Sequence, residues 1–527
     1  MTHSSEGQAV VAEDVPINSV QEGNGKNDNS GNNTSRKGKG FSKLGFVLAT
    51  AGAAVGLGNI WRFPIQVHEY GGGAFVLMCL LFAALLGGVL LILEIAIGRR
   101  AGQGVFGAFR QLCKKFWWLG LLATLVPFLV LCYYNVIGGW TLYYAVYYIT
   151  YGMGNGFDAF DPTKNPDGSK NLYNNFLGIG NGSFGYVAIV FTLIFIAIIL
   201  FIVLLGVQKG IEKVSKIIMP VLAVFIVFVA IYTLCQKHAW EGVKHFFIPD
   251  FKRFFGMVNE NGVATGMFSM KGMLAAITQV FYSLSVGSAS LITYGSYMQK
   301  KESISKATTQ IIVFDSAISI LAGLIIIPGL FILGGGVAVA SEGGSHLLFV
   351  QLPQLFYKTG GAWGSLIFGG LFFTLVFFAA LSSTIAMLEA VVDGFMDLFK
   401  MTRKKAVIIS GIFYALLAMV ICFGHAFEWR GLPMVDGKDN NGVTVWTNMN
   451  IDDTIDFVAS TLIVCVVSFL TCVAASWCSD FTRIQDEVGY KKKWSRGFYK
   501  IMIKYVAPLL IMVILVWGVL STFVAFD

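Results

Sequence analysis

The chain has 527 residues, of which 56% are hydrophobic and 13% charged, with a mean hydropathy of +0.69 and a formal net charge of +8. This composition excludes a soluble globular protein and indicates an integral membrane protein in a lipid bilayer. The sequence contains no Walker-type phosphate loop, no HExxH pattern and no CxxC pair. It therefore indicates neither nucleotide-driven transport nor metalloenzyme chemistry, and the eight cysteines are expected to be small core residues.

The chain begins with a polar stretch, residues 1–35, whose Asn, Ser and Gly content predicts disorder. No short apolar signal with a cleavage site precedes the first hydrophobic segment, so that segment is expected to act as the insertion signal. We therefore assign residues 1–40 to a disordered cytoplasmic tail.

Apolar segments long enough to cross a bilayer fill the rest of the chain, as a window of about 19 residues shows. The eleven segments cover residues 44–67, 73–97, 117–150, 186–206, 217–235, 273–298, 310–334, 363–398, 406–423, 457–477 and 506–526. We therefore predict an all-α protein with eleven transmembrane helices.

Basic residues predict the orientation, because cytoplasmic loops of membrane proteins are enriched in Lys and Arg. With the N-terminus inside, residues 36–43 and the five loops on that side hold 26 Lys and Arg, whereas the five loops on the other side hold 10. The positive charge therefore reflects topology, and no nucleic-acid partner is indicated. An odd number of spans predicts a multi-pass protein of the cell inner (plasma) membrane with a cytoplasmic N-terminus and an extracellular or periplasmic C-terminus.

The first span contains "ATAGAAVGLGNIWRFP" (residues 49–64), in which Gly52, Gly56 and Gly58 weaken a helix and are followed by the polar Asn59 and Arg62. The sixth span contains "QVFYSLSVGSASLITY" (residues 279–294), with four serines around a glycine. These spans open two blocks of five spans, and the odd number turns the second block upside down relative to the first. Paired broken helices at corresponding positions of an inverted repeat predict a binding site near the bilayer midplane.

Free backbone groups at such breaks would attract the carboxylate and ammonium of a zwitterion together with sodium. The seventh span adds Asp315 in "TTQIIVFDSAIS", and the eighth adds the serines of "FFAALSSTIAMLEAVVDGFMD". Serines are also common at helix contacts, where they serve packing alone. A buried carboxylate needs a partner, and we favour a bound cation for Asp315 over a proton or a purely structural hydrogen bond.

The segments "AGAAVGLGNIWRFP", "GGGAF", "YYNVIGGW", "KGIEKVSKIIMP" and "ALSSTIAMLE" resemble the neurotransmitter:sodium symporter family, in its bacterial amino-acid transporter branch. The resemblance runs from about Phe41 to the end of the chain. It implies the fold of the bacterial leucine transporter, a 5+5 inverted repeat with broken helices one and six plus one C-terminal helix. The repeats would cover residues 41–236 and 237–480, and the eleventh span residues 481–527.

The resemblance also implies which residues bind sodium and substrate. Sodium site one would consist of Ala54, Asn59, Ser283 and Asp315. Sodium site two would consist of Gly52, Val55, Ala379, Ser382 and Ser383. The amino-acid site would be formed by Ala53, Ala54, Leu57, Gly58, Val130, Tyr134, Tyr282, Ser283, Ser285, Ser288, Ser383 and Met387.

Three positions depart from the pattern of other family members. Gly56 stands where monoamine carriers have an aspartate, which leaves room for a substrate with its own carboxylate. Asp315 and Cys79 stand where chloride-dependent relatives have Asn and Tyr, and a fixed carboxylate can supply the negative charge that chloride supplies there. The pattern therefore predicts Na⁺ coupling without a chloride requirement.

The family pattern places gates at both ends of the pathway. Arg62 and Asp456 would form the outer gate, and Asp397 would form the inner gate with Arg36 or Lys37. We therefore expect no enzyme but a sodium-coupled symporter that imports an amino acid by alternating access. An ion channel and a transporter-like nutrient sensor are the alternatives.

Overall fold

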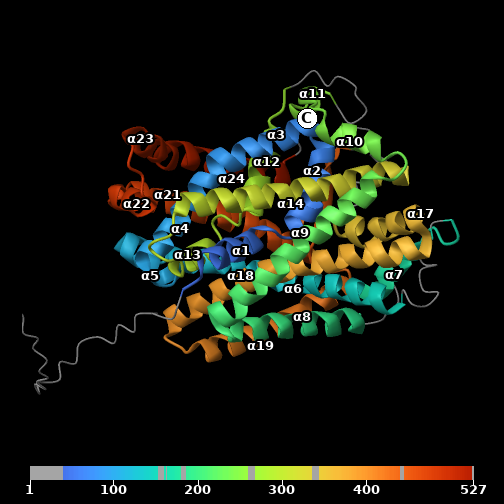
Figure 1. Cartoon of the computed structure of the whole chain (residues 1–527), viewed down its shortest axis with the longest axis horizontal. Coiled ribbons are helices and arrows are strands. Elements are labelled where there is room, and N and C mark those ends of the chain that lie inside the picture. Colours follow the sequence, from blue (N-terminus) through green and yellow to red (C-terminus); the bar gives the residue numbers. More distant parts are fainter. Residues whose placement is uncertain are drawn as a thin grey trace, which may run out of the picture. The chain divides into compact units, whose positions relative to one another are not determined.

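Hydrophobic helices packed side by side make up most of the protein (Figure 1). The computed structural model describes residues 40–151, 160–161, 163–179, 185–258, 268–334, 344–438 and 444–524. By its contacts the chain divides into Met1–Lys37 and Gly38–Asp527, and the description below concerns the second part. The expected tail over residues 1–40 lies outside the described residues, apart from Gly40.

The first half of the described chain consists of helices alone. In order, they are α1 (Lys43–Ala54), η1 (Gly58–Arg62), α2 (Phe63–Glu69), α3 (Gly73–Phe82), η2 (Ala83–Gly87), α4 (Gly88–Ala101), α5 (Val105–Leu112), η3 (Lys114–Phe116), α6 (Leu119–Tyr151), α7 (Gly168–Leu177), α8 (Tyr186–Leu204), η5 (Val207–Glu212), α9 (Lys213–Leu234), α10 (Ala239–Phe247) and α11 (Phe251–Phe254).

The second half adds two strands to its helices. In order, these elements are α12 (Lys271–Ser283), α13 (Ser290–Ser296), α14 (Ile304–Leu333), α16 (Gly344–His346), η7 (Leu347–Gln351), α17 (Leu352–Gly364), η8 (Ser365–Gly369), α18 (Gly370–Phe399), α19 (Arg403–Ala426), β1 (Arg430–Lys438), β2 (Thr444–Asn450), α20 (Ile451–Asp456), η9 (Phe457–Ile463), α21 (Val464–Ser476), α22 (Phe481–Val488), α23 (Lys493–Ile501), η10 (Met502–Val506) and α24 (Ala507–Phe523).

Among the described residues, nine helices are long and apolar enough to cross a membrane, and α1 with η1 and α2 forms a bent pair that would be a tenth. The predicted sixth span, residues 273–298, is divided between α12 with 13 residues and α13 with 7. Neither piece reaches the roughly 20 residues that a crossing helix needs. The predicted membrane-spanning helical architecture is confirmed, and the number of eleven spans stays a prediction.

Both predicted helix breaks are present. Span one breaks after α1, where Val55 is extended (φ −72°, ψ 107°), and the two halves differ in direction by 58°. Span six breaks between α12 and α13, where Ser285, Gly287 and Ala289 have φ values of 53°, 80° and 62°. This left-handed backbone cannot continue a right-handed helix and leaves backbone groups free of helical partners.

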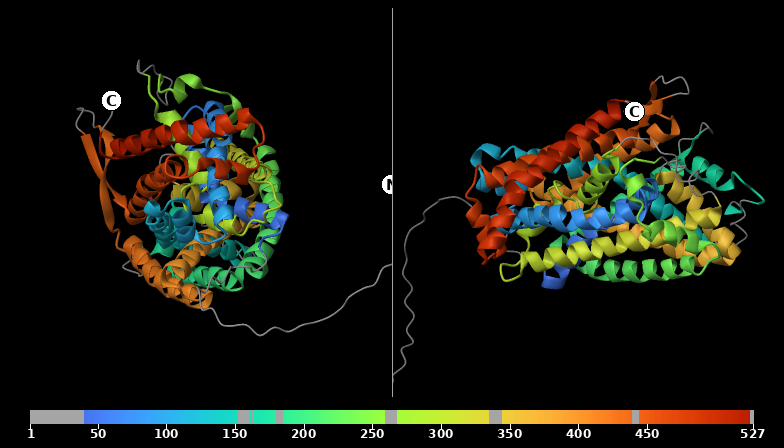
Figure 2. Two further views of the ribbon diagram at one scale, coloured as in Figure 1. Left: turned by 90° about the vertical axis from the view of Figure 1, so that its left-hand side faces the viewer. Right: turned by 90° about the horizontal axis from the view of Figure 1, so that it is seen from above.

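A β-hairpin departs from the all-α prediction. Strand β1 pairs antiparallel with β2, with Pro433 opposite Asn448 and Val435 opposite Trp446. The second strand, "TVWTNMN", carries the β-branched and aromatic residues typical of strands. Figure 2 shows the hairpin at the edge of the helices, and β1 contacts α24.

A buried aromatic cluster holds together two helices, α6 and α18, that carry part of the predicted site. Tyr144 and Tyr148 of α6 pack against Phe373 of α18, with ring centroids 4.9 and 5.3 Å from that of Phe373, and the ring centroids of Trp140 and Phe349 are 5.8 Å apart. Such aromatic pairs add to the free energy gained by burying the rings. The cluster fixes α6 against α18 and so sets the distance between the site residues of those two helices.

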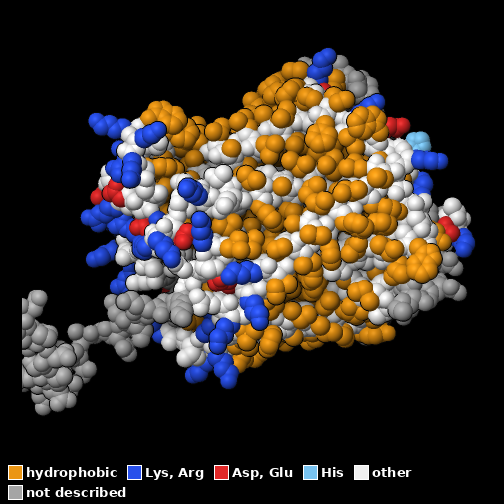
Figure 3. Space-filling model, viewed as in Figure 1, with side chains coloured by type: hydrophobic (Ala, Val, Ile, Leu, Met, Phe, Trp, Pro, Cys, Tyr) orange, Lys and Arg blue, Asp and Glu red, His pale blue; other side chains and the backbone are white. Residues whose placement is uncertain are grey.

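Lys and Arg side chains gather at one end of the molecule, and hydrophobic side chains cover the middle of the face shown in Figure 3. At the basic end, the buried Arg99 of α4 donates from Nε to Glu487 of α22 (2.7 Å), and Lys300 Nζ lies 2.9 Å from the same oxygen. Burial raises the pKa of Glu487, but the hydrogen bonds from Lys300 and Arg99 outweigh it and hold that pKa below its usual value of 4.5.

Removing this carboxylate is expected to destabilise the protein. Glu487→Ala leaves the Arg99 side chain, 5% exposed, without its counter-charge, and should cost about 3 kcal/mol. Thermal unfolding in detergent measures the loss. Because the folded-state pKa is depressed, the stabilisation is present above the unfolded pKa and disappears as the pH falls through the folded one.

A control variant shows whether the loss of stability in Glu487→Ala exceeds that caused by removing an exposed ion pair. Glu428→Ala removes an exposed pair with Arg430 and should cost less than about 0.5 kcal/mol. Equal unfolding temperatures for the two variants would contradict the assigned role of Glu487.

Candidate substrate and sodium site

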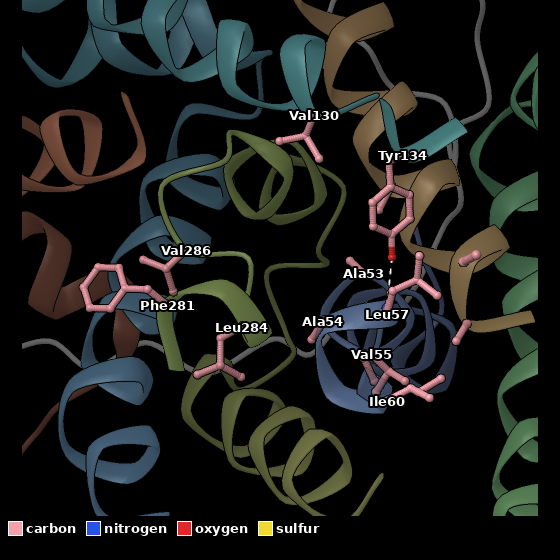
Figure 4. Close-up of a cluster of buried hydrophobic side chains, with 14 of the residues drawn as sticks. Ala53, Ala54, Val55, Leu57, Ile60, Val130, Tyr134, Phe281, Leu284 and Val286 are labelled. Atoms are coloured by element: carbon pink, nitrogen blue, oxygen red, sulfur yellow. Dashed lines mark hydrogen bonds between the residues drawn. The ribbon is translucent and has the colours of Figure 1, made fainter. Parts of the chain in front are cut away.

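The gap in span one lies at the centre of the predicted site. Figure 4 shows Ala53, Ala54, Val55 and Leu57 at this gap, with Tyr134 of α6 pointing toward them. The Leu57 amide donates to the Tyr134 hydroxyl at 3.0 Å, and the Ala53 carbonyl accepts from Ser285 at 3.0 Å. The two broken helices therefore meet through free backbone groups.

Asn59 connects the first gap to α14. Its carbonyl oxygen accepts from the Gly56 amide at 3.0 Å, and its amide nitrogen lies 2.8 Å from Ser283, 2.7 Å from Asp315 and 2.8 Å from Ser319. Ser283 in turn lies 2.9 and 2.7 Å from the two Asp315 oxygens. All these side chains are buried. The side chains of Asn59, Ser283 and Asp315, predicted for sodium site one, are therefore in mutual contact. Ala54, the last residue of α1, lines the same cavity as Asn59.

Backbone carbonyls of span one lie close to a hydroxyl of α18. The Ser383 hydroxyl lies 3.2 Å from the Gly52 carbonyl and 2.9 Å from the Val55 carbonyl. Ser382 donates to the Ala379 carbonyl at 3.1 Å. Hydroxyl and carbonyl oxygens suit a hard cation. The residues predicted for sodium site two thus lie together across two helices.

A cavity of about 490 Å³ opens beside the gap. Of the predicted substrate residues, those lining it are Ala53, Ala54, Gly58, Val130, Tyr134, Tyr282, Ser285, Ser288, Ser383 and Met387. Leu57 contributes its amide, as described above, and Ser283 lies with Asp315. A Cβ at Gly58 would lie 2.7 Å from the Tyr282 ring, so the close approach of α12 requires glycine there. The cavity has the volume of a small-molecule site.

The outer gate residues are linked through two tyrosines. The Arg62 guanidinium lies 4.8 Å from the centre of the Tyr282 ring, and the Tyr133 hydroxyl lies 3.5 Å from the Tyr282 hydroxyl and donates to Asp456 at 2.6 Å. Within the described residues, Arg62 and Asp456 form no direct ion pair. Arg62 also lines the cavity, so the cavity extends from the gap to the outer gate.

The inner gate is only half described. A Cβ at Gly104, just before α5, would collide with the carboxylates of Asp393 and Asp397, so α5 begins directly beside the predicted gate residue. Arg36 and Lys37 lie outside the described residues, and the pairing of Asp397 with either stays a prediction.

Several contacting residues escaped the sequence analysis. Ser319 follows Asp315 by one helical turn, so its contact with Asn59 could have been expected from the i, i+4 spacing. Gln279 donates to the Gly58 carbonyl at 3.3 Å, and Glu94 accepts from the Gly287 amide at 2.7 Å. No short pattern in the sequence indicates these last two contacts.

Comparison with known proteins decides the family. The model of the sodium:neurotransmitter symporter family matches residues 38–155 and 164–525. The chain belongs to this family. This symporter is 32% identical over 396 residues to YhdH, an uncharacterised sodium-dependent transporter of Bacillus subtilis, a match covering 73% of this chain and 78% of the relative. It is 28% identical to an uncharacterised sodium-dependent transporter of Methanocaldococcus jannaschii, over 89% of this chain and 88% of the relative.

A solved structure agrees with the sequence relatives. The structure of MhsT in complex with L-phenylalanine has a TM-score of 0.75 and 32% identity to this symporter, and the match covers 91% of this chain and 99% of MhsT. The fold class expected from the sequence is therefore confirmed. The protein is a sodium-coupled secondary transporter of the membrane and not an enzyme.

Proposed function

We propose that this symporter imports an amino acid together with Na⁺ by alternating access. The observation that carries the proposal is the break in the helix of span one. There, backbone groups without helical partners lie next to the Tyr134 hydroxyl at the edge of the cavity. The amides of Leu57 and Gly58 would bind the substrate carboxylate. The carbonyls of Ala54, Tyr282 and Ser283 and the Ser285 hydroxyl would bind its ammonium. MhsT, solved with L-phenylalanine, supports an amino-acid substrate.

We assign one sodium ion to Ala54, Asn59, Ser283 and Asp315, beside the substrate carboxylate. A second is assigned to Gly52, Val55, Ala379, Ser382 and Ser383, where it would hold span one against α18. Each ion moving down about 100 mV releases about 2.3 kcal/mol. A tenfold sodium gradient adds about 1.4 kcal/mol for each ion. Two ions could therefore drive accumulation of the amino acid by several decades.

Uptake of a panel of labelled amino acids into proteoliposomes tests the proposal. We expect accumulation of at least one amino acid with an inward sodium gradient and none with potassium in its place. Ion flux without amino acid would indicate a channel, and sodium-dependent binding without uptake would indicate a sensor. Either result would overturn the proposal.

We also propose that the N-terminus is cytoplasmic and that the C-terminus lies on the opposite side of the membrane. The gathering of Lys and Arg side chains at one end of the molecule supports this orientation (Figure 3).

We further propose that transport needs no chloride. Asp315, Cys79, Gln279, Ser283 and Ser319 line a small cavity of about 30 Å³ next to the proposed sodium site one. The Asp315 carboxylate already supplies a negative charge there. Opposite charges a few Å apart attract by several kcal/mol at an intermediate dielectric, so this charge can replace that of an anion.

Asp315→Asn is expected to lower chloride-free uptake by at least about tenfold, the equivalent of about 1.4 kcal/mol, or to make uptake respond to chloride. Initial uptake rates in gluconate and in chloride measure the effect. Asp486→Asn, at an exposed carboxylate of α22 that pairs with Arg496, is the control and should leave uptake unchanged. Unaltered chloride-free uptake by Asp315→Asn would refute the role of this carboxylate.

A further inference from the structure

The helix that leads into the last span exposes a stripe of apolar side chains. Helix α23 continues through η10 into α24, and only 22% of the most apolar stretch of this continuous helix, Lys493–Phe523, is buried, the lowest share of the nine candidate spans among the described residues. Trp494, Phe498, Ile501 and Tyr505 are all exposed. Their spacing of four, three and four residues places them on one face of the helix, as an aromatic stripe.

The opposite face of the same helix packs against the protein. Tyr499 is 1% exposed and stacks on Phe481 of α22, with ring centroids 5.4 Å apart. Ile503, one turn further along, is also buried, and the Gln485 side chain donates to the Arg496 carbonyl at 2.7 Å. These contacts fix the rotation of the helix, so the aromatic stripe points away from the protein.

Lysines follow one side of the aromatic stripe. Lys493, Lys500 and Lys504 are seven and four residues apart, a spacing that places them along one edge of the stripe. The Lys504 ammonium lies 4.5 Å from the centre of the Trp477 ring and 5.6 Å from that of Tyr505, which holds it beside the stripe. The exposed lysines of this segment are Lys491, Lys492, Lys493 and Lys500.

The four exposed lysines have no counter-charge within the described part of the chain. The two acidic residues of α22 are already engaged, since Asp486 pairs with Arg496, and Glu487 with Arg99 and Lys300. An exposed apolar face with unpaired positive charge along its edge is complementary to a surface that is apolar on one side and anionic on the other.

The length of the helix places the aromatic stripe at the level of the lipid headgroups. Lys493–Phe523 has 31 residues, which at about 1.5 Å per residue is about 46 Å, more than the roughly 30 Å of the hydrocarbon core. The excess lies at the Lys493 end, where the charged residues are. Figure 1 shows α23 at the end of the molecule where Lys and Arg side chains gather in the same view of Figure 3.

We propose that the aromatic stripe and its lysines bind anionic phospholipids of the leaflet at the basic end of the molecule. The rings of Trp494 and Phe498 would lie between headgroups and acyl chains, and the ammonium groups would contact the phosphates. A second copy of the chain is a poorer occupant. In a symmetric contact between two stripes the unpaired lysines of both copies would face each other and repel.

Lipid titration of the purified full chain in detergent, followed by native mass spectrometry, tests the binding. We expect phosphatidylglycerol to bind at least about tenfold more tightly than phosphatidylcholine with the same acyl chains. The combined variant Lys491→Gln, Lys492→Gln, Lys493→Gln and Lys500→Gln should lose this preference. The matched control removes the same charge from exposed lysines of two other loops and should keep it; its changes are Lys301→Gln, Lys400→Gln, Lys404→Gln and Lys405→Gln.

The double variant Trp494→Ser and Phe498→Ser examines the apolar part of the surface, and it too should weaken phosphatidylglycerol binding. Glycerol phosphate, which has the anionic group without acyl chains, should not displace the lipid. Equal affinity for the two lipids, or an equal loss in both lysine variants, would refute the proposal. Displacement by glycerol phosphate would indicate a simple anion site instead. Paired copies that form without lipid and separate in the double variant would show that a second chain covers the stripe, and would also overturn the proposal.

Discussion

Gly56→Asp is expected to abolish amino-acid uptake. A Cβ at Gly56 would lie 2.8 Å from the Tyr134 hydroxyl and 2.9 Å from the Ser383 hydroxyl, closer than side-chain carbons approach such groups. An aspartate there also places a negative charge beside the amides proposed to bind the substrate carboxylate. Like charges a few Å apart repel by several kcal/mol, so affinity should fall by more than about a hundredfold.

Sodium-dependent binding of the labelled substrate measures the effect of Gly56→Asp. The matched control is Gly497→Asp in α23, where no atom lies within 4 Å of the added Cβ. The control should bind like the wild type, and the unfolding temperature of Gly56→Asp shows whether the variant folds. A folded Gly56→Asp protein with normal affinity would place the substrate carboxylate elsewhere.

Asn59→Ala is expected to weaken sodium binding and, with it, sodium-driven transport. The change deletes the carboxamide that contacts Gly56, Ser283, Asp315 and Ser319, and so leaves several buried polar groups without their partner. Each unsatisfied group costs about 1–3 kcal/mol. Together these losses should raise the sodium concentration needed for half-maximal uptake by more than about a hundredfold, since each 1.4 kcal/mol is a factor of ten.

The loss of sodium binding can be tested without knowledge of the substrate, because bound sodium should raise the unfolding temperature of the protein. We expect the rise in the wild type and its absence in Asn59→Ala. Asn135→Ala is the control, because this equally buried asparagine on α6 has no hydrogen-bond partner among the described residues. Equal sodium responses of the two variants would contradict the role of Asn59.

The centre of the site could be predicted because it contains polar and helix-weakening residues within apolar membrane spans. Three glycines and an asparagine in the first span, or a carboxylate such as Asp315 in an apolar helix, are costly in a bilayer unless they serve a site. Such residues stand out in a single sequence. The structure brings Asn59, Ser283 and Asp315 into contact, as the family pattern implied.

Contacts between ordinary residues could not be predicted. Tyr133 and Tyr282 lie between Arg62 and Asp456, but tyrosines are common in membrane helices and their partners depend on helix packing. The hairpin was missed because its residues lie between apolar spans, where hydropathy carries no information on strand pairing. The prediction that all eight cysteines are core residues was wrong for three of them, because Cys235 and Cys478 are exposed and Cys113 is half-buried.

A density map of the symporter with sodium and its transported amino acid bound addresses the gap in span one most directly. If the free backbone of that gap binds the substrate, the map will show a carboxylate against the amides of Leu57 and Gly58, with cations beside Asn59 and Ser383. A continuous first helix, or an amino acid held outside the cavity between α6, α12 and α18, would contradict the proposed site.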